Sequence, residues 1–261
     1  MSDAAKRSQL HVALAGGTRG IGRALARELV ARGHGVALLG RDREQLARSA
    51  ADLAARSGPD ARVPVAELDL LRPDTFGPAL DAVDAAFREA RAGGIDTVVL
   101  TAAEFATQDE LEADLERLHR LLAADFTGSI LFCEEARRRL VARGGGTLCV
   151  FGSVAGDRAR KPVAIYGAAK AGLAHYLDGL DLRYGSPSFR VLVVKPGFVR
   201  TGMTQGLPEP PFAADPEPVA RRVANALQHG RSGVLYTPPI WRLVMAVIRR
   251  LPRAVMRRAR F

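Results

Sequence analysis

The chain lacks the features that mark several large classes of protein. It has two cysteines in 261 residues, 6% aromatic residues, and no apolar run near the ~20 residues that a membrane-spanning helix needs. Cys133 and Cys149 lie inside apolar segments without metal-ligand spacing, which indicates two reduced core thiols and predicts no metal site. A 48% apolar content also excludes a disordered chain or a fibrous repeat.

One segment combines many arginines with a lack of acidic residues. The net charge is +10, but residues 241–261 contain seven arginines and no acid, so the rest of the chain carries only +3. The positive charge therefore lies mostly in this tail and does not indicate a general binding surface for a polyanion. Stacking aromatic residues and a second basic face are absent, and we predict no nucleic-acid partner.

The first residues do not read as a secretory signal. Residues 1–9 are polar, and the apolar run at 10–15 is too short for the core of a signal peptide and continues into glycines. We therefore expect a cytoplasmic protein.

Strand-like and helix-like segments alternate along the chain. Apolar runs typical of strands lie at residues 10–15, 35–40, 62–69, 97–101, 146–152 and 190–194. Segments with helical periodicity lie at residues 21–32, 43–56, 74–92, 109–122, 124–143, 163–184 and 216–229. This alternation, without a linker or a repeat, predicts one α/β domain over residues 1–261 built on a doubly wound parallel sheet.

A proline-rich segment interrupts the alternation. Residues 207–218 contain five of the fifteen prolines and cannot form a regular helix or a central strand. The segment follows a strand end, where open α/β sheets bind ligands. It is a candidate substrate lid, and the alternative is an ordinary surface loop.

Glycines cluster between the first predicted strand and the first predicted helix. Gly16, Gly20 and Gly22 allow a sharp turn and a close approach of the backbone, and the helix start offers N–H groups to an anion. At this position, the cluster predicts a dinucleotide site.

A phenol and an ammonium lie four residues apart on the predicted helix 163–184. Tyr166 and Lys170 share one helix face, and the cation is expected to lower the phenol pKa from ~10 toward the working range of an acid–base group. Ser153 ends a predicted strand, and its hydroxyl could hold a substrate oxygen beside the phenol.

These motifs resemble those of the short-chain dehydrogenases/reductases, a Rossmann-fold family, over most of the chain. The fingerprint Thr-Gly-x-x-x-Gly-Ile-Gly is present with Ala15 in the threonine position. The resemblance implies hydride transfer between a nicotinamide and a carbonyl carbon. In it Tyr166 gives a proton, Ser153 positions the oxygen, and Lys170 tunes the phenol and binds the ribose. The implied cofactor-binding residues are Gly16, Thr18, Arg19, Gly20, Ile21, Gly22, Arg41, Asp69, Ala102, Tyr166, Lys170, Pro196, Gly197, Val199 and Thr201.

Charge at the end of the second strand favours NADP(H). An acid there would bind the 2′-hydroxyl of NAD, whereas Arg41 and Arg19 suit a 2′-phosphate. Asp42 argues the other way, unless it caps the helix that follows.

The chain departs from the family pattern at two places. Leu100-Thr101-Ala102-Ala103 replaces Asn-Asn-Ala-Gly, for which we expect altered packing but retained catalysis. Asp125 occupies the place of the asparagine that extends the proton relay, so it joins the candidate catalytic residues, and its charge should change the pH profile.

The C-terminal half is similar to the decaprenylphosphoryl-2-keto-ribose reductases at 153–200 and 234–258. The resemblance implies a ketone on a sugar or another bulky alcohol, in a form that can be lipid-linked. In residues 241–261, nine large apolar residues alternate with the arginines, as in an amphipathic helix at an anionic membrane, here the inner face, with a kink at Pro252. The alternative is a helix packed at a subunit interface.

The leading hypothesis is therefore an NADPH-dependent ketone reductase, and the family implies a homodimer or homotetramer formed through the long helices. One alternative is a soluble ketoreductase or alcohol dehydrogenase of a biosynthetic pathway. Another is a cofactor-binding sensor or scaffold without turnover, against which the intact Ser153, Tyr166 and Lys170 argue.

Overall fold

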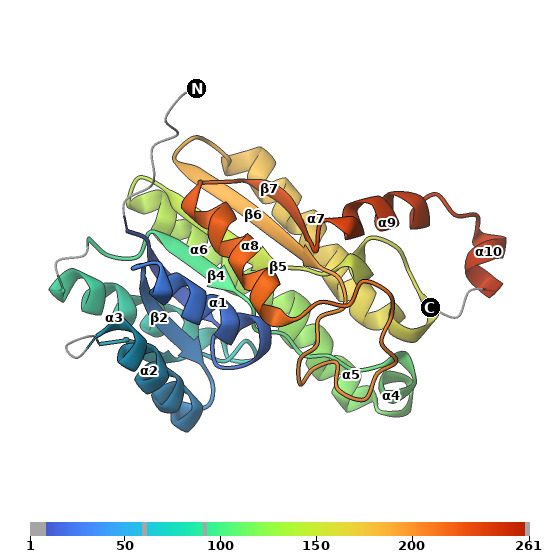
Figure 1. Ribbon diagram of the computed structural model, residues 1–261, viewed down its shortest axis with the longest axis horizontal. Coiled ribbons are helices and arrows are strands. Elements are labelled where there is room, and N and C mark those ends of the chain that lie inside the picture. The colour runs from blue at the N-terminus through green and yellow to red at the C-terminus, as the bar shows by residue number, and fades with distance from the viewer. Residues whose placement is uncertain (1–8, 59–61, 91–92, 259–261) are drawn as a thin grey trace.

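Seven parallel strands form one sheet in the order β3-β2-β1-β4-β5-β6-β7 (Figure 1). The structure is a computed structural model that describes residues 9–58, 62–90 and 93–258. The strands are β1 His11–Ala15, β2 Gly35–Gly40, β3 Val65–Glu67, β4 Thr97–Leu100, β5 Gly146–Phe151, β6 Phe189–Pro196 and β7 Gly233–Thr237. The order reverses between β1 and β4, which creates the crevice at the carboxyl edge where such sheets bind ligands.

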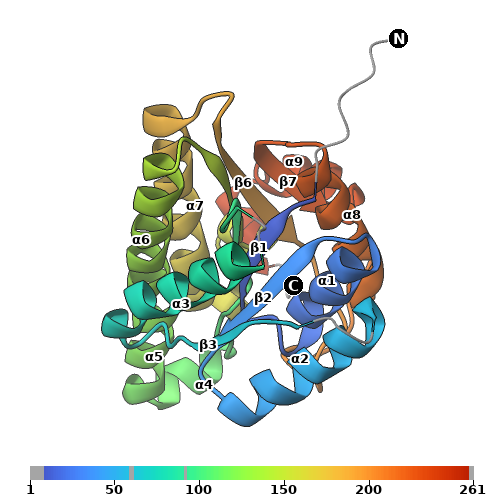
Figure 2. The same ribbon diagram turned by 90° about the vertical axis from the view of Figure 1, so that its left-hand side faces the viewer.

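Helices cover both faces of the sheet, so the molecule has three layers (Figure 2). One face carries α1 Gly20–Ala31, α2 Arg43–Ser57 and α8 Pro216–Gln228. The other carries α3 Phe76–Glu89, α6 Ser129–Ala142 and α7 Ala164–Tyr184. The remaining helices are α4 Gln108–Ala113, α5 Leu115–Leu122, α9 Ile240–Ile248 and α10 Arg253–Arg258. The predicted doubly wound α/β fold is confirmed.

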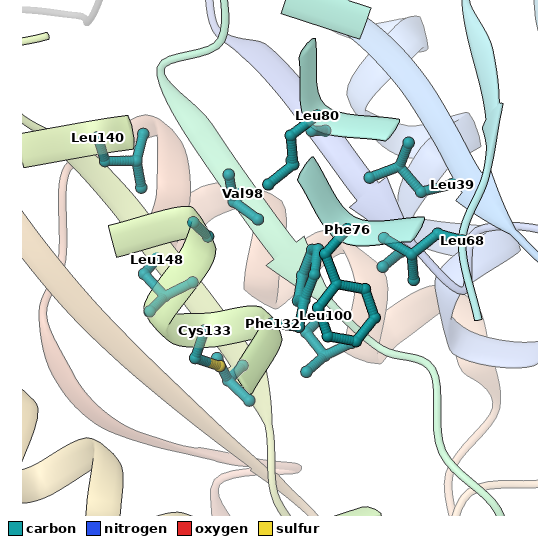
Figure 3. Close-up of a cluster of buried hydrophobic side chains, with 14 of the residues drawn as sticks. Leu39, Leu68, Phe76, Leu80, Val98, Leu100, Phe132, Cys133, Leu140 and Leu148 are labelled. Atoms are coloured by element: carbon teal, nitrogen blue, oxygen red, sulfur yellow. The ribbon is translucent and has the colours of Figure 1, made fainter. Parts of the chain in front are cut away.

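The strands are apolar on both sides because each side meets helices. Along β1, Val12 and Leu14 enter the core under α1 and α8, whereas Ala13 and Ala15 enter the core under α3, α6 and α7. Figure 3 shows this second core, in which Phe76 and Phe132 pack edge to face. Each fully buried side chain of this size contributes about 1.5–3 kcal/mol to folding.

The helical prediction at 109–122 is corrected, because two short helices replace one. A capping box of Thr107 and Glu110 opens α4, and the Asp114 carboxylate opens α5 by accepting from the backbone N–H of Arg117. The next predicted helix, 124–143, begins as a π-helical segment over Ala123–Gly128 before α6 starts. A Cβ at Gly128 would lie 1.9 Å from the Leu70 carbonyl oxygen, so only glycine fits at this contact with the Leu70 backbone.

Other boundaries also move. The strand predicted at 62–69 is shorter, covering Val65–Glu67, and the strand predicted at 190–194 extends over Phe189–Pro196. β7 was not predicted. The prolines at 216 and 218 belong to α8, which leaves 207–215 as the loop of the candidate lid. Residues 1–8, the last two residues of the helix predicted at 74–92, and 259–261 of the tail lie outside the described residues.

The basic tail, expected as one helix with a kink at Pro252, forms two helices separated by residues 249–252. α9 places Trp241 and Met245 in a buried cluster with Val154, while Leu243 and Val247 are exposed on its other face. Within the described residues, no helix is long and apolar enough to cross a bilayer.

Candidate active site

The first turns of α7 carry the predicted acid–base pair. Tyr166 and Lys170 are both buried on the face of α7 that meets the sheet edge, and the ammonium lies 5.6 Å from the centre of the phenol ring. Ser153 follows β5, where its hydroxyl oxygen accepts from the backbone N–H of Ala155 at 3.0 Å. The structure therefore brings together the three side chains that the sequence singled out.

Asp125 joins this group through direct contact with the lysine. Its Oδ2 lies 2.9 Å from Lys170 Nζ, with 0% and 2% of the two side chains exposed. Its Oδ1 accepts from the backbone N–H of Glu104 at 2.7 Å. The π-helical segment carries the carboxylate into this position.

The phenol pKa departs from expectation. Burial raises the pKa of Tyr166 above its ordinary value, Lys170 lowers it and Asp125 raises it, and the net direction is upward. The direction is opposite to the expected lowering, first because the phenol is buried and then because Asp125 offsets part of the effect of Lys170. Burial lowers the pKa of Lys170, but Asp125 and Tyr166 raise it more, so the amine stays protonated.

The glycine loop lies at the carboxyl end of β1, with Thr18 and Arg19 in its turn and Ile21 in the first turn of α1. Gly16 has φ +89°, and a Cβ there would lie 2.5 Å from the backbone nitrogen of Ala102, so the loops after β1 and β4 are in contact. Gly20, at φ +50°, faces the Thr201 side chain.

The start of α1 fits a pyrophosphate. Arg19 is the N-cap residue and forms no side-chain cap, which leaves the first N–H groups of the helix to an anion. Gly22 packs too closely on the Gly16 carbonyl for any larger residue, so the backbone of this cradle is held in place. The residues present therefore fit a dinucleotide.

Two arginines flank the expected adenosine position. Arg41 is exposed and its Nη1 lies 3.1 Å from Glu104 Oε1, and Arg19 Nε donates to Gln45 Oε1 at 2.9 Å. Asp42 caps α2 by accepting from the backbone N–H of Gln45, which confirms the capping role. Asp69 follows β3, and its carboxylate accepts from the backbone N–H of Leu71.

The motif after β6 runs against the C-terminal tail. Pro196 is buried, and a Cβ on Gly197 would lie 1.9 Å from the indole nitrogen of Trp241, so the indole lies directly on this glycine. Val199 pairs with Ala214 in an isolated bridge. Sequence reasoning treated Trp241 only as a residue of the tail and missed this contact.

The tail is also tied to the segment between Ser153 and Tyr166. Arg158 donates to the Leu251 carbonyl at 2.9 Å, and Lys161 Nζ donates to the carbonyl of Arg257. Beside them, Asp157 holds Lys195 at 2.5 Å and the Tyr236 hydroxyl at 2.7 Å. The tail is therefore attached to a wall of the site.

The candidate lid is anchored at its base. Arg200 forms ion pairs with Glu209 and with Asp215, the second at 3.1 Å. These pairs are exposed and join the two ends of the loop 207–215. Among the described residues, no group of three or more His, Cys, Asp or Glu could hold a metal ion.

The sheet, the glycine loop and the buried Tyr–Lys pair define a dinucleotide-binding α/β oxidoreductase. The family described as short chain dehydrogenase matches residues 10–211. The chain belongs to this family of short-chain dehydrogenases.

Known proteins resemble the chain along most of its length. It is 34% identical to an uncharacterized oxidoreductase of Mycobacterium tuberculosis, over 95% of this chain and 96% of the relative. It is 31% identical to carbonyl reductase family member 4 of Xenopus tropicalis, over 83% and 90%. A solved short-chain dehydrogenase/reductase of Mycobacterium marinum superposes with TM-score 0.77 at 25% identity, over 89% and 97%.

Proposed function

We propose that the protein reduces a ketone with NADPH. The observation that carries the proposal is the group formed by buried Tyr166, buried Lys170 and half-buried Ser153 at the sheet edge that also holds the glycine loop. The similarity to carbonyl reductase family member 4 supports a carbonyl substrate.

The chemistry divides simply between protein and cofactor. When bound, the nicotinamide supplies the hydride. Tyr166 donates its proton to the carbonyl oxygen. The Ser153 oxygen accepts from Ala155 N–H and its side chain is hydrogen-bonded to Tyr166, so its O–H is placed to donate to the same substrate oxygen. Lys170, kept protonated by Asp125, stabilises the phenolate that results.

NADPH rather than NADH is proposed because of Arg41 and Arg19. Both guanidinium groups lie outside the core, and Asp42, the acid that follows Arg41 after β2, is occupied as a helix cap. Arginine binds a phosphate through two parallel hydrogen bonds, so both side chains suit a 2′-phosphate.

The substrate ketone is proposed to belong to a sugar or another bulky alcohol, with a lipid-linked form reached from a membrane surface. The support is α9, whose outer face exposes 66% of Leu243 and 63% of Val247 beside arginines without acidic partners among the described residues. Apolar side chains flanked by arginines complement an anionic bilayer. The alternative, a soluble ketoreductase with a small ketone, predicts no vesicle binding.

Self-association through the long helices is proposed as the assembly. Leu131 on α6 and Leu182 on α7 expose 44% and 84% of their surface, which suits burial against a second copy. Sedimentation of the protein at micromolar concentration distinguishes a dimer or tetramer from a monomer.

The test of the function is Tyr166→Phe. We expect wild type to oxidise NADPH in the presence of a ketone and the variant to lose at least about 100-fold in kcat, the usual value of acid–base catalysis. Since the phenol does not hold the nucleotide, NADPH affinity should be unchanged by fluorescence titration. A fully active variant would reject the mechanism, and binding of NADPH without turnover of any ketone would favour a sensor.

A further inference from the structure

One arginine beside the catalytic tyrosine has no counterion. Arg160 lies between Ser153 and Tyr166, immediately before the short 3₁₀ turn Lys161–Val163. Its side chain is half-buried, its Nε is enclosed, and no described residue forms an ion pair or hydrogen bond with its guanidinium. Enclosing a charge without a partner is costly, so the arrangement calls for an explanation.

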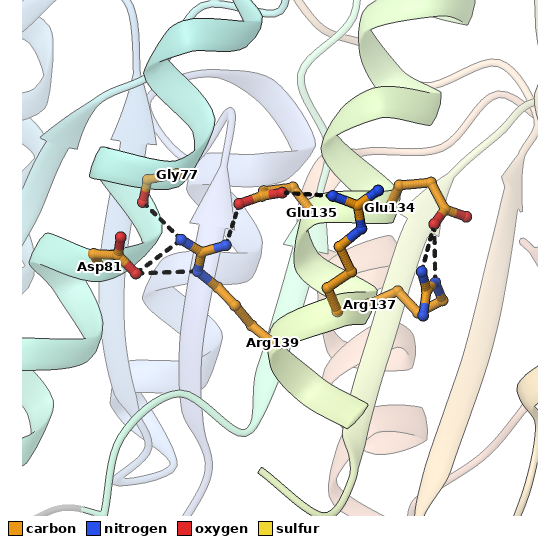
Figure 4. Close-up of polar contacts among 7 residues, drawn as sticks. Gly77, Asp81, Glu134, Glu135, Arg137 and Arg139 are labelled. Atoms are coloured by element: carbon orange, nitrogen blue, oxygen red, sulfur yellow. Dashed lines mark hydrogen bonds and ion pairs between the residues drawn. The ribbon is translucent and has the colours of Figure 1, made fainter. Parts of the chain in front are cut away.

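Two other half-buried arginines, Arg139 and Arg137, are satisfied. Arg139 contacts Asp81, Glu135 and the Gly77 carbonyl, as Figure 4 shows. Arg137 holds Glu134 at 2.7 Å in the same view. Acidic partners are therefore available to such side chains elsewhere in the fold. Arg160 is unpaired because of its own surroundings.

The acid nearest in sequence is already occupied. Asp157 binds Lys195 and Tyr236, and so is not available to Arg160. The flanking cations, Arg158 and Lys161, point to carbonyls of the tail and not to an acid. The segment is thus fixed on both sides of Arg160 while the guanidinium itself stays unpaired.

The position of Arg160 relates it to the reaction. Among the described residues, the phenol of Tyr166 is the group whose charge acts on it, and Arg160 in turn favours the phenolate. Burial lowers the pKa of the guanidinium, and Tyr166 raises it. A group that supplied a negative charge here would lie beside the proton donor.

Arg190 shows that an unpaired nitrogen alone does not define a site. Its Nη1 is also buried without a partner, but the residue is the second of β6, at the amino edge of the sheet. Ligands of parallel sheets bind at the carboxyl edge, where Tyr166 and Ser153 lie. Arg190 therefore provides a matched control.

We propose that Arg160 recognises an anionic group of the substrate, a carboxylate or a phosphate, on the molecule whose ketone is reduced. The inference rests on the proposed reductase function and names its substrate class, an anionic ketone. The guanidinium can bind either anion through two parallel hydrogen bonds. Tyr166 transfers its proton to the carbonyl oxygen while the anion is held by Arg160.

Matched substrates test the proposal at saturating NADPH. Acetoacetate is compared with its neutral ethyl ester, and dihydroxyacetone phosphate with dihydroxyacetone. Wild type should prefer the charged member of at least one pair in kcat/KM, and the pair that responds identifies the anion. Arg160→Gln should lower kcat/KM for the charged ketone by roughly 10- to 100-fold, the effect of one hydrogen bond to a charged group. The neutral ketone should lose much less, because it makes no contact with the guanidinium.

Two controls separate recognition from other roles. Arg190→Gln removes the same charge and should leave both members of a pair unaffected, and Arg160→Lys should retain part of the preference. Equal rates of wild type on charged and neutral ketones would overturn the proposal. So would an equal loss on both in Arg160→Gln with a displaced pH profile, because Arg160 would then act on the Tyr166 phenol.

A binding measurement separates the inference from the proposed function. In the Tyr166→Phe background with NADPH bound, calorimetry should detect the charged ketone and lose it when Arg160 is changed to Gln. Arg160-dependent binding without reduction of any ketone by wild type would reject the reductase function and leave the anion site standing. Reduction of neutral ketones, without any preference for the charged ketone in binding, would keep the reductase function and reject the anion site.

Discussion

Lys170 Nζ lies 2.9 Å from Asp125 Oδ2, and neither side chain is open to solvent. The ammonium that stabilises the Tyr166 phenolate is therefore shared with a carboxylate. The family pattern has an uncharged asparagine at this position, so the chain carries one extra negative charge beside its proton donor. The acid–base behaviour of the site depends on this pair.

Asp125→Asn should shift the pH profile toward lower pH. Removing the carboxylate favours the phenolate, so the pKa of Tyr166 falls. Ketone reduction needs the protonated phenol and is lost as pH rises through that pKa, so its decline should begin at lower pH. Alcohol oxidation needs the phenolate, and its rise should also begin at lower pH. Initial rates in both directions measure the two limbs.

Asp125→Ala provides the comparison. It leaves the buried Lys170 unpaired and removes the acceptor for the Glu104 N–H, so we expect a stability loss of about 3–5 kcal/mol in urea unfolding. The asparagine variant keeps an acceptor at the same place and should lose less. Identical pH profiles for wild type and Asp125→Asn would mean that the carboxylate does not act on Tyr166.

Cofactor preference should depend on Arg41 and on Glu104, the carboxylate that competes with the 2′-phosphate for Arg41. Arg41→Asp should weaken NADPH by about 1.5–3 kcal/mol and spare NADH, because the lost contact is to the 2′-phosphate alone. Glu104→Gln should strengthen NADPH, since the carboxylate holds Arg41 at 3.1 Å and must release it. Fluorescence titration with both nucleotides measures the four affinities.

Arg43→Gln is the matched control for this cofactor test. Arg43 is a neighbouring exposed arginine, but it is paired with Glu67 on the β3 side. Its replacement should change neither affinity. Equal binding of NADPH and NADH by wild type and Arg41→Asp would reject the NADPH assignment.

Local sequence patterns predicted the helices and strands whose surroundings are the same along their whole length. β4 and β5 are buried on both faces, so their runs are apolar apart from Thr97 and Thr147, and the glycine loop follows from the turn that it must make. The Tyr166–Lys170 pair was predictable because both residues belong to one helix. Asp42 was predictable as a cap because its acceptor role is met three residues away.

Contacts between distant segments were not predictable in the same way. The break at Asp114 lies inside a continuous helical pattern, where a cap competes with apolar periodicity. β7 is a short edge strand with one face open, and its pattern is weak. The packing of Trp241 on Gly197 and the unpaired state of Arg160 depend on the tail and on residue 157, which only the folded chain brings together.

Gly197→Ala should destabilise the protein through Trp241. The new Cβ would lie 1.9 Å from the indole nitrogen, and overpacking of this kind costs about 1–3 kcal/mol. Trp241→Ala removes the obstacle but loses its burial, at about 3–5 kcal/mol. In the double variant the two costs should sum to less than the separate values, because the collision no longer occurs. Urea unfolding of the four proteins measures the coupling.

Gly179→Ala serves as the control for backbone effects. Gly179 is exposed within α7, and a Cβ there meets nothing within 4 Å, so the change should stabilise by about 0.5–1 kcal/mol. Additive costs at positions 197 and 241 would contradict the proposed contact.

Membrane binding should depend on the outer face of α9. Leu243 and Val247 lie one turn apart on this face, whereas Trp241 and Met245 on the inner face cover Val154. Deleting the tail would therefore also uncover the core, and point changes give a cleaner test. Changing both Leu243 and Val247 to Ser should abolish binding to vesicles that contain anionic lipid and leave the melting temperature unchanged.

Two further measurements test the membrane prediction: the effect of salt on vesicle binding, and the effect of a change at an exposed leucine elsewhere on the surface. Arginines near an anionic surface contribute about 1 kcal/mol each, and the Debye length falls from ~10 Å at 0.1 M salt to ~3 Å at 1 M, so binding should weaken as salt is added. Leu182→Ser removes a leucine of α7 that is even more exposed and should leave vesicle binding intact. Co-sedimentation with anionic and neutral vesicles measures this. If the wild-type protein does not bind anionic vesicles at low salt, the membrane prediction is wrong, and the exposed face of α9 is better explained by a contact with another subunit.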